Sequence, residues 1–479
     1  MNYTNLQAVR ADIQAGATNC QALVRQYLDR IEATKALNIY IEVFEEEALE
    51  QARQLDQKYQ QNPESIGRLF GMVLSLKDVL CYKDHEVTAG SRILQGFKSL
   101  FSATAVQRLL EEDAIIIGRV NCDQFAMGSD NGNSYYGQTW NAADPERVPG
   151  GSSGGCAASV QAHTCLASIG SDTGGSVRQP AAFCGLVGMK PTYGRISRYG
   201  LLAYASSFDQ IGTISHSVAD AALLLEVMAG PDEFDATASH RPVDTYSPLP
   251  TLDRKVRIAY FEAALQHEQI DESIRELSMD FIEKLRSDGH SVEAVPFDLL
   301  DYIIPAYYVL TTAEASSNLS RYDGIRFGYR QREAADLSET YKKSRTEGFS
   351  PEVKRRIMLG TFVLSAGYYD AYYTKAQKVR RLIHQRTNEI FEEYDFILMP
   401  ATPGVAWKGG DKSNDPVEMY LADIFTVQAN MAGIPAVCIP LGEGTANMPV
   451  GIQIMGQAFK EQEMLCFARH YGPDQGQSA

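Results

Sequence analysis

The N-terminal part of the chain has hydrophobic residues at helical spacing. Leu23, Tyr27 and Ile31 follow one another at intervals of four residues, with charged residues between them. This spacing places them on one side of a helix, as in helices that pack against a core. The pattern predicts helices across residues 5–61, with the acidic group Glu45–Glu47 as one solvated helix face.

Further along, the pattern changes to short, continuous apolar runs. Residues 69–78 read Leu-Phe-Gly-Met-Val-Leu-Ser-Leu-Lys-Asp, which indicates a buried strand with Lys77 near its end. Similar runs predict strands at residues 114–118 and 165–169, and later at 256–260, 396–399, 436–439 and 450–454.

Helical patterns alternate with these strands, for example at residues 218–228 and 270–287. Such alternation predicts an α/β fold in which helices cover a largely buried central sheet. No repeat or low-complexity linker divides the chain, so we expect a single domain over residues 1–479. Its parts are an N-terminal helical segment (1–67), a core (68–230) and a mainly helical layer on the substrate side (302–394).

Charge and composition narrow the function. The formal net charge is −16 over 479 residues, and such a chain repels phosphate backbones, so any nucleic acid would be held by a partner chain. No apolar run of membrane-spanning length occurs, and the first residues do not show the pattern of a secretory leader, so we expect neither a leader nor membrane contact. The eight cysteines have no C-x-x-C or metal-ligand spacing and are expected to be reduced and buried, as in a cytoplasmic protein.

The strongest chemical signal lies in residues 170–180, Gly-Ser-Asp-Thr-Gly-Gly-Ser-Val-Arg-Gln-Pro. Two adjacent glycines place Ser176 in a tight turn, where several backbone N–H groups converge. Such a turn suits a serine nucleophile and the oxyanion that it creates. A second glycine-serine cluster, Gly150–Gly155, precedes it, and the two together indicate an acyl-transfer enzyme.

The base that would activate this serine is not evident from the motif. Histidine is the usual choice, but His163 lies in an apolar stretch and His216 at a predicted helix start. Lysine can serve where burial lowers its pKa, which makes Lys77 a candidate; the plainer alternative is a solvated lysine at a strand end. Residues 151–155 also match G-x-S-x-G, but a polar loop with two prolines precedes them where a nucleophile elbow needs a strand.

Residues 150–155, 172–181 and 183–192 together resemble the amidase signature family, in a long and specific match. The resemblance implies the fold of that family, a central mixed β-sheet covered by helices on both faces. It also implies that Ser176 is the nucleophile, Lys77 the base, and Ser152, after a cis peptide bond, the serine that relays the proton between them. The implied oxyanion hole consists of the N–H groups of Thr173, Gly174, Gly175 and Ser176.

Within that family, residues 187–212, 314–324 and 353–360 are similar to the subunits that release ammonia from glutamine for tRNA-dependent amidotransferases. This similarity implies glutamine as the amide donor, with Arg356 on its α-carboxylate and Asp423 on its α-ammonium group, pairings that suit a free amino acid. Tyr307 would line the same pocket. For Arg356 and Asp423 the alternative is a charge on an exposed helix surface.

The same similarity implies a cytoplasmic heterotrimer with the B and C subunits of such an amidotransferase as partners. The first partner would use ATP and Mg²⁺ to amidate glutamyl-tRNA or aspartyl-tRNA, and the second, a small protein, would pack against this chain, which itself would hold no cofactor or metal. Residues 127–134, which border the active site, depart from the usual serine-threonine-glutamate pattern. A stand-alone amidase of another small amide and a non-catalytic scaffold remain as alternative hypotheses.

Overall fold

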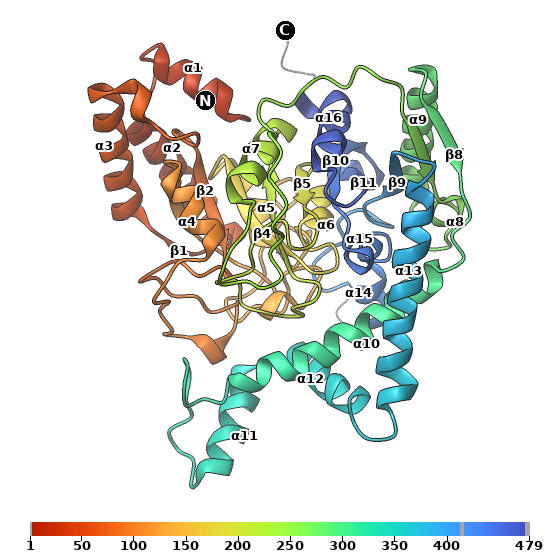
Figure 1. Ribbon diagram of the computed structural model, residues 1–479. Coiled ribbons are helices and arrows are strands. Elements are labelled where there is room, and N and C mark those ends of the chain that lie inside the picture. Colours follow the sequence, from red (N-terminus) through yellow and green to blue (C-terminus); the bar gives the residue numbers. More distant parts are fainter. Residues whose placement is uncertain (1, 412–415, 475–479) are drawn as a thin grey trace.

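A mixed sheet of eleven strands lies at the centre of the protein (Figure 1). The computed structural model describes residues 2–411 and 416–474, and within them the strand order is β1-β3-β2-β4-β6-β5-β10-β11-β9-β7-β8. Strand β2 is parallel to β3 and β4, and β7 is parallel to β8 and β9, whereas the other neighbouring pairs are antiparallel. The strands are β1 (Tyr40–Val43), β2 (Val73–Lys77), β3 (Ile115–Val120), β4 (Ala167–Asp172), β5 (Val187–Lys190), β6 (Gln210–Ser215), β7 (Arg257–Tyr260), β8 (Ser291–Ala294), β9 (Phe396–Pro400), β10 (Ala436–Glu443) and β11 (Pro449–Gly456).

Helices cover both faces of this sheet. Cys438 of β10 shares a buried cluster with Ala182 of α6, whereas a Cβ atom placed at Gly472, just after α16, would lie 3.6 Å from the side chain of the next residue, Ile439. Successive strand residues point to opposite faces, so α6 and α16 lie on opposite sides, which confirms the predicted fold class. The helices are α1 (Leu6–Gln14), α2 (Cys20–Ala33), α3 (Glu45–Gln61), α4 (Thr104–Glu111), α5 (Gly154–Gln161), α6 (Arg178–Phe183), α7 (Val218–Met228), α8 (Glu262–Leu265), α9 (Glu272–Ser287), α10 (Leu300–Asn318), α11 (Leu337–Gly348), α12 (Pro351–Val363), α13 (Lys375–Phe391), α14 (Pro416–Leu421), α15 (Val427–Ala432) and α16 (Glu461–Tyr471).

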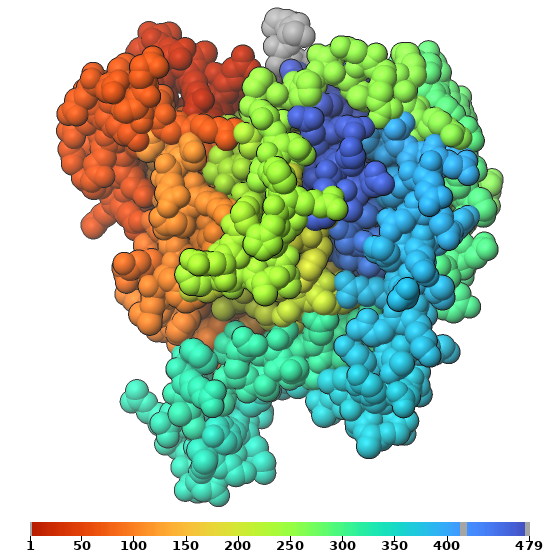
Figure 2. Space-filling view, in the orientation of Figure 1, coloured from red at the N-terminus to blue at the C-terminus, as the bar shows by residue number. Residues whose placement is uncertain are grey.

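Residues 300–391 form a helical layer beside the sheet. Helices α10, α11, α12 and α13 make up this layer, which contains no strand. Helix α12 packs along α10, and Figure 2 shows the segment around α11 and α12 protruding below the body that holds the sheet. One side of α12 therefore faces the interior and can carry residues of a buried site.

The helical prediction for residues 5–61 is wrong at one place. Residues 40–43 form strand β1, which pairs antiparallel with β3 at the edge of the sheet. A Cβ atom at Gly118 of β3 would lie 2.6 Å from the Glu42 carbonyl oxygen. The glycine thus permits a close approach of the two backbones, and this long-range pairing outweighs the helical pattern on either side.

The buried strands are found where the apolar runs predict them, with shifted ends. The run at residues 69–78 forms a shorter strand, β2, because a turn with Gly71 at φ +88° precedes it. Strands β5, β6 and β8 are missing from the predictions. Of these, β6 matters most for the site, since it pairs with β4 along the whole strand that leads to Ser176.

Two predictions from composition concern the cysteines and the absence of membrane-spanning segments. All eight cysteines are free and buried, which confirms the expectation drawn from their spacing. Among residues 2–411 and 416–474, no helix combines the length and apolar character needed to cross a lipid bilayer.

Candidate active site

A short turn between β4 and α6 carries Ser176. Gly175 has φ +129°, a conformation that favours glycine, and a Cβ atom there would collide with the side chain of Thr426. A Cβ atom at Gly174 would lie 2.5 Å from the hydroxyl oxygen of Tyr307. Both glycines of the predicted tight turn are therefore required by the surrounding structure.

Asp172, the last residue of β4, holds the turn from inside. Its carboxylate accepts hydrogen bonds from the N–H groups of Gly175 (2.9 Å) and Val177 (3.2 Å). It also pairs with Arg178 at 3.0 Å, and both side chains are fully buried. Burial alone would raise the pKa of Asp172, but the Arg178 guanidinium outweighs it and lowers the pKa to about 2. The carboxylate thus stays ionised and acts as a fixed anchor for the turn.

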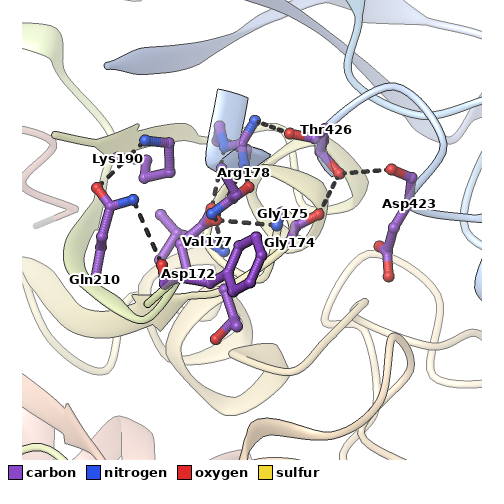
Figure 3. A network of polar contacts seen from close by, with 12 residues as sticks. Asp172, Gly174, Gly175, Val177, Arg178, Lys190, Gln210, Asp423 and Thr426 are labelled. Carbon is purple, nitrogen blue, oxygen red and sulfur yellow. Dashed lines mark hydrogen bonds and ion pairs between the residues drawn. The ribbon is translucent and has the colours of Figure 1, made fainter. Parts of the chain in front are cut away.

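Segments far along the chain complete this anchor (Figure 3). Arg178 donates from Nη1 to the Thr426 carbonyl oxygen (2.8 Å) and to Gln453 Oε1 (2.9 Å), and from Nη2 to Asn430 Oδ1 (2.7 Å). The Thr426 hydroxyl donates to the carbonyl oxygen of Gly174 at 2.7 Å. Helix α15 and strand β11 therefore fix the position of the serine turn.

Lys77 lies at the end of β2, fully buried. Its Nζ lies 2.7 Å from Ser152 Oγ, 2.9 Å from Ser153 Oγ and 3.0 Å from Ser171 Oγ. No carboxylate pairs with Lys77 within the described part of the chain, and burial lowers the pKa of its amine from the ordinary value. A neutral amine surrounded by hydroxyl groups can accept a proton, which is the property required of a base.

Ser152 follows a cis peptide bond from Gly151, as the family resemblance implies. The Ser152 carbonyl oxygen accepts from the N–H of Asp123 at 3.3 Å, and the N–H of Ser153 donates to the Ser176 carbonyl oxygen at 3.2 Å. The two glycine-serine clusters of the sequence thus lie side by side, with Ser152 facing Lys77.

Ser176 itself is 8% exposed, and its hydroxyl makes no hydrogen bond within the described residues. The Lys77–Ser152 contact of the predicted relay is present, whereas a Ser152–Ser176 hydrogen bond is not formed in this structure. Of the predicted oxyanion donors, the Gly175 N–H is held by Asp172. The other three predicted donors, the N–H groups of Thr173, Gly174 and Ser176, have no hydrogen-bond partner in the described part of the chain.

Arg356 lies on the inner side of α12 and is 3% exposed, so the alternative of a surface charge is wrong. Its Nε donates to Glu352 Oε1 at 2.8 Å and its Nη1 to the Tyr204 hydroxyl oxygen at 2.9 Å. The guanidinium also lies over the rings of Tyr308 and Tyr420, at 5.2 and 5.3 Å. Nη2 has no hydrogen-bond partner among the described residues and can bind an added anion.

Asp423 precedes α15 and is 9% exposed, so it is not the exposed helix charge of the alternative interpretation either. Its Oδ2 accepts from the Ser129 hydroxyl at 2.7 Å, while Oδ1 is buried without a partner in the described residues. Burial raises the pKa of Asp423 to about 7, against the lowering effects of Ser129 and Arg356. The divergent loop at residues 127–134 therefore reaches this pocket through Ser129.

Sequence reasoning missed several residues that contact the predicted ones. Ser153 and Ser171 lie at hydrogen-bonding distance from Lys77, and both belong to the quoted motifs, so their position beside Ser152 and Asp172 was an available signal. Four residues that contact Arg356, Glu352 or Asp423 were not identified individually: Ser129 and Tyr204 lie within stretches that the sequence analysis singled out, whereas Glu352 and Tyr420 do not.

The sequence matches the family described as Amidase over residues 22–465. The chain belongs to the amidase family. It is 51% identical to the A subunit of the glutamyl-tRNA(Gln) amidotransferase of Chlorobium luteolum, over 98% of this chain and 97% of that protein. The resemblance drawn from the serine motifs is thereby confirmed.

Solved structures of amidases agree with this assignment. The crystal structure of the A subunit of glutamyl-tRNA(Gln) amidotransferase from Thermotoga maritima matches with a TM-score of 0.76 and 38% identity, over 94% of this chain and 91% of that one. The native peptide amidase of Stenotrophomonas maltophilia matches with a TM-score of 0.81 and 29% identity, over 98% of this chain and 96% of that one. The amidase fold is therefore common to relatives with different names.

Proposed function

We propose that this protein hydrolyses glutamine as the amidase subunit of a tRNA-dependent amidotransferase. The observation that carries the proposal is that a buried guanidinium, Arg356, and a buried carboxylate, Asp423, each have an unpaired polar atom among the described residues. A free amino acid presents the opposite charges, a carboxylate and an ammonium group. The name of relatives that are about half identical supports the same activity.

In the proposed mechanism, neutral Lys77 accepts the proton of Ser152 while Ser152 accepts the proton of Ser176. Ser176 Oγ attacks the side-chain amide carbon of glutamine and forms a tetrahedral intermediate. The N–H groups of Thr173 and Gly174, together with that of Ser176 itself, bind the oxyanion. The proton returns through the relay to the leaving nitrogen, ammonia departs, and water hydrolyses the γ-glutamyl ester to glutamate.

The released ammonia is used elsewhere in the proposed complex. One partner, the B subunit, would bind the tRNA, with ATP and Mg²⁺, and amidate glutamyl-tRNA or aspartyl-tRNA, while the small C subunit would complete a cytoplasmic heterotrimer. The net charge of −16 supports this division of labour, because this chain would repel tRNA and meet it through the partner.

Replacing Arg356 by methionine is expected to raise the KM for glutamine about 10- to 100-fold, the usual cost of losing a charge-assisted hydrogen bond. The reason is that the α-carboxylate of glutamine loses its cation. Steady-state ammonia release from the complex, with glutamine and with 4-aminobutanamide, measures the effect. The second substrate is glutamine without its carboxylate, so its KM is expected to stay the same.

Arg355→Met is the matched control, since Arg355 lies on the same helix with a half-exposed side chain and is expected to leave both substrates unaffected. An Arg356→Met protein with an unchanged KM for glutamine would refute the proposed pocket. Equal turnover of glutamine and 4-aminobutanamide by the unaltered protein would favour a stand-alone amidase of another small amide.

The KM for glutamine is expected to rise as the pH falls through about 7. The pKa of Asp423 is raised to about 7 by burial, so this carboxyl is neutral below that pH and loses its attraction for the ammonium group, and it is charged above that pH. KM profiles between pH 5.5 and 8.5 test this. Glutaramate, which has the carboxylate and the amide but no amino group, is expected to show no such step, and Asp423→Asn should remove the step for glutamine.

A further inference from the structure

A buried series of polar contacts joins the serine turn to Arg356. The Thr173 hydroxyl donates to Asp209 Oδ1 at 2.7 Å. Asp209 Oδ2 accepts the N–H groups of Tyr204 (2.9 Å) and Ala205 (3.0 Å), and the Tyr204 hydroxyl oxygen accepts from Arg356 Nη1 at 2.9 Å. Every residue in the series is at most 3% exposed, so water does not compete for these contacts.

Asp209 is an unusual group to bury at this point. No cation pairs with it within the described residues, and burial raises the pKa of its carboxyl to about 7, against the hydrogen bond from Thr173. Burying a charge without a counter-ion is costly. The carboxylate is, however, the side chain that can accept at the same time from the hydroxyl of the turn and from two backbone N–H groups of the segment that carries Tyr204.

Tyr204 is held on its other side by the helical layer. Its hydroxyl donates to Thr311 Oγ1 at 2.9 Å, and the Thr311 hydroxyl donates to the carbonyl oxygen of Tyr307. Tyr307 in turn lies against Gly174. The segment from Tyr204 to Asp209 therefore contacts the serine turn, α10 and Arg356 together.

We propose that Asp209 and Tyr204 are positioning residues that couple carboxylate binding at Arg356 to the geometry of the serine turn. The inference rests on the proposed function, in which Arg356 binds the α-carboxylate of glutamine. A bound carboxylate holds the Arg356 guanidinium in place, and the guanidinium in turn holds Tyr204. Asp209, which accepts from the Tyr204 N–H, then holds the side chain of Thr173, next to the N–H groups that bind the oxyanion. Part of the donor's binding energy is then expressed in kcat rather than in KM.

Tyr204→Phe tests this coupling because it removes one hydroxyl group. We expect kcat for glutamine to fall about tenfold, the size of one lost hydrogen bond, and kcat for 4-aminobutanamide, which cannot engage Arg356, to stay the same. Tyr246→Phe is the matched control, since that buried tyrosine also accepts from an arginine, Arg195, at 3.0 Å, and should leave kcat unchanged. A Tyr204→Phe protein with equal losses on both substrates would overturn the proposal.

A double-mutant cycle supplies the second test. Thr173→Val removes the hydroxyl that contacts Asp209, and Thr173→Ser is expected to restore activity on glutamine. The Thr173→Val, Tyr204→Phe double variant should be no worse than the poorer single variant, whereas multiplying factors would overturn the coupling. Asp209→Asn is not used as a test, because its amide oxygen can accept from the two backbone N–H groups while its NH₂ group donates to the Thr173 hydroxyl oxygen, which would preserve the connection. Absence of glutamine hydrolysis in the unaltered complex would refute the proposed function itself.

Discussion

Ser176→Ala is expected to lower the rate of glutamine hydrolysis on the order of 10⁶-fold, as for a serine nucleophile removed from its relay. The reason is geometric: Ser176 lies in the turn whose N–H groups converge, whereas the hydroxyls of Ser152 and Ser153 lie against Lys77. The Ser176 hydroxyl makes no hydrogen bond among the described residues, so its loss should hardly affect stability. Ammonia release measures the rate, and mass spectrometry of the complex after rapid quenching detects the γ-glutamyl ester.

Ser168→Ala is the matched control for that experiment. Ser168 lies on β4, the strand that leads to the turn, and its buried hydroxyl contacts Ser75 at 2.7 Å. Its loss should cost about 1 kcal/mol of stability and leave kcat unchanged. Glutamine hydrolysis at a normal rate by the Ser176→Ala complex would contradict the proposed nucleophile.

Lys77→Met is expected to lower kcat about 10³- to 10⁴-fold, the upper range for loss of a general base. Methionine keeps most of the length of the side chain but cannot accept a proton from Ser152. Burial lowers the pKa of Lys77. The amine therefore loses its proton, and becomes able to act as a base, at a lower pH than an ordinary lysine does. For the unaltered protein, kcat should therefore fall as the pH drops through the lowered pKa, and this limb should be absent from the Lys77→Met profile.

Two further variants isolate the role of the amine. Lys77→Arg keeps a cation that does not lose its proton and should be as inactive as Lys77→Met. Lys190→Met removes another fully buried lysine, whose Nζ donates to the Pro191 carbonyl oxygen at 2.8 Å; it should lower the melting temperature but leave the kcat of the folded protein close to normal. An active Lys77→Arg protein would rule out lysine as the base.

Part of the fold follows from local pattern because several central strands are continuous apolar runs buried on both faces. Strands β2, β3, β4 and β9 are entirely buried, and each corresponds to a continuous apolar run. Strands β5 and β6 are also entirely buried but were missed, since glycine and polar residues interrupt their apolar runs. The strands that sequence reasoning missed at the sheet edges differ in this respect. Strand β1 is half-buried throughout and β8 is largely exposed, and each has four residues, so neither leaves an apolar run that differs from its surroundings.

The residues of the site likewise fall into those that a local sequence pattern predicts and those that it does not. The sequence predicts some parts of the site from neighbouring residues alone. These parts are Ser152, Ser176 and the glycines of the turn, which belong to short glycine-serine motifs. Asp209 and Tyr204 are not predicted in this way, because their roles depend on contacts with residues 36 and 152 positions away. Such pairings are set by how the helical layer packs on the sheet, and no spacing along the chain encodes them.

The long-range anchoring of the serine turn has a consequence for the newly made protein. The turn lies at residues 173–176, but the groups that hold it in place, Thr426, Asn430 and Gln453, are about 250 or more positions downstream. A nascent chain on the ribosome therefore contains the nucleophile and its base long before it contains their supports. Chains that end before these residues lack the contacts that hold the serine turn, so we expect them to be unable to hydrolyse amides.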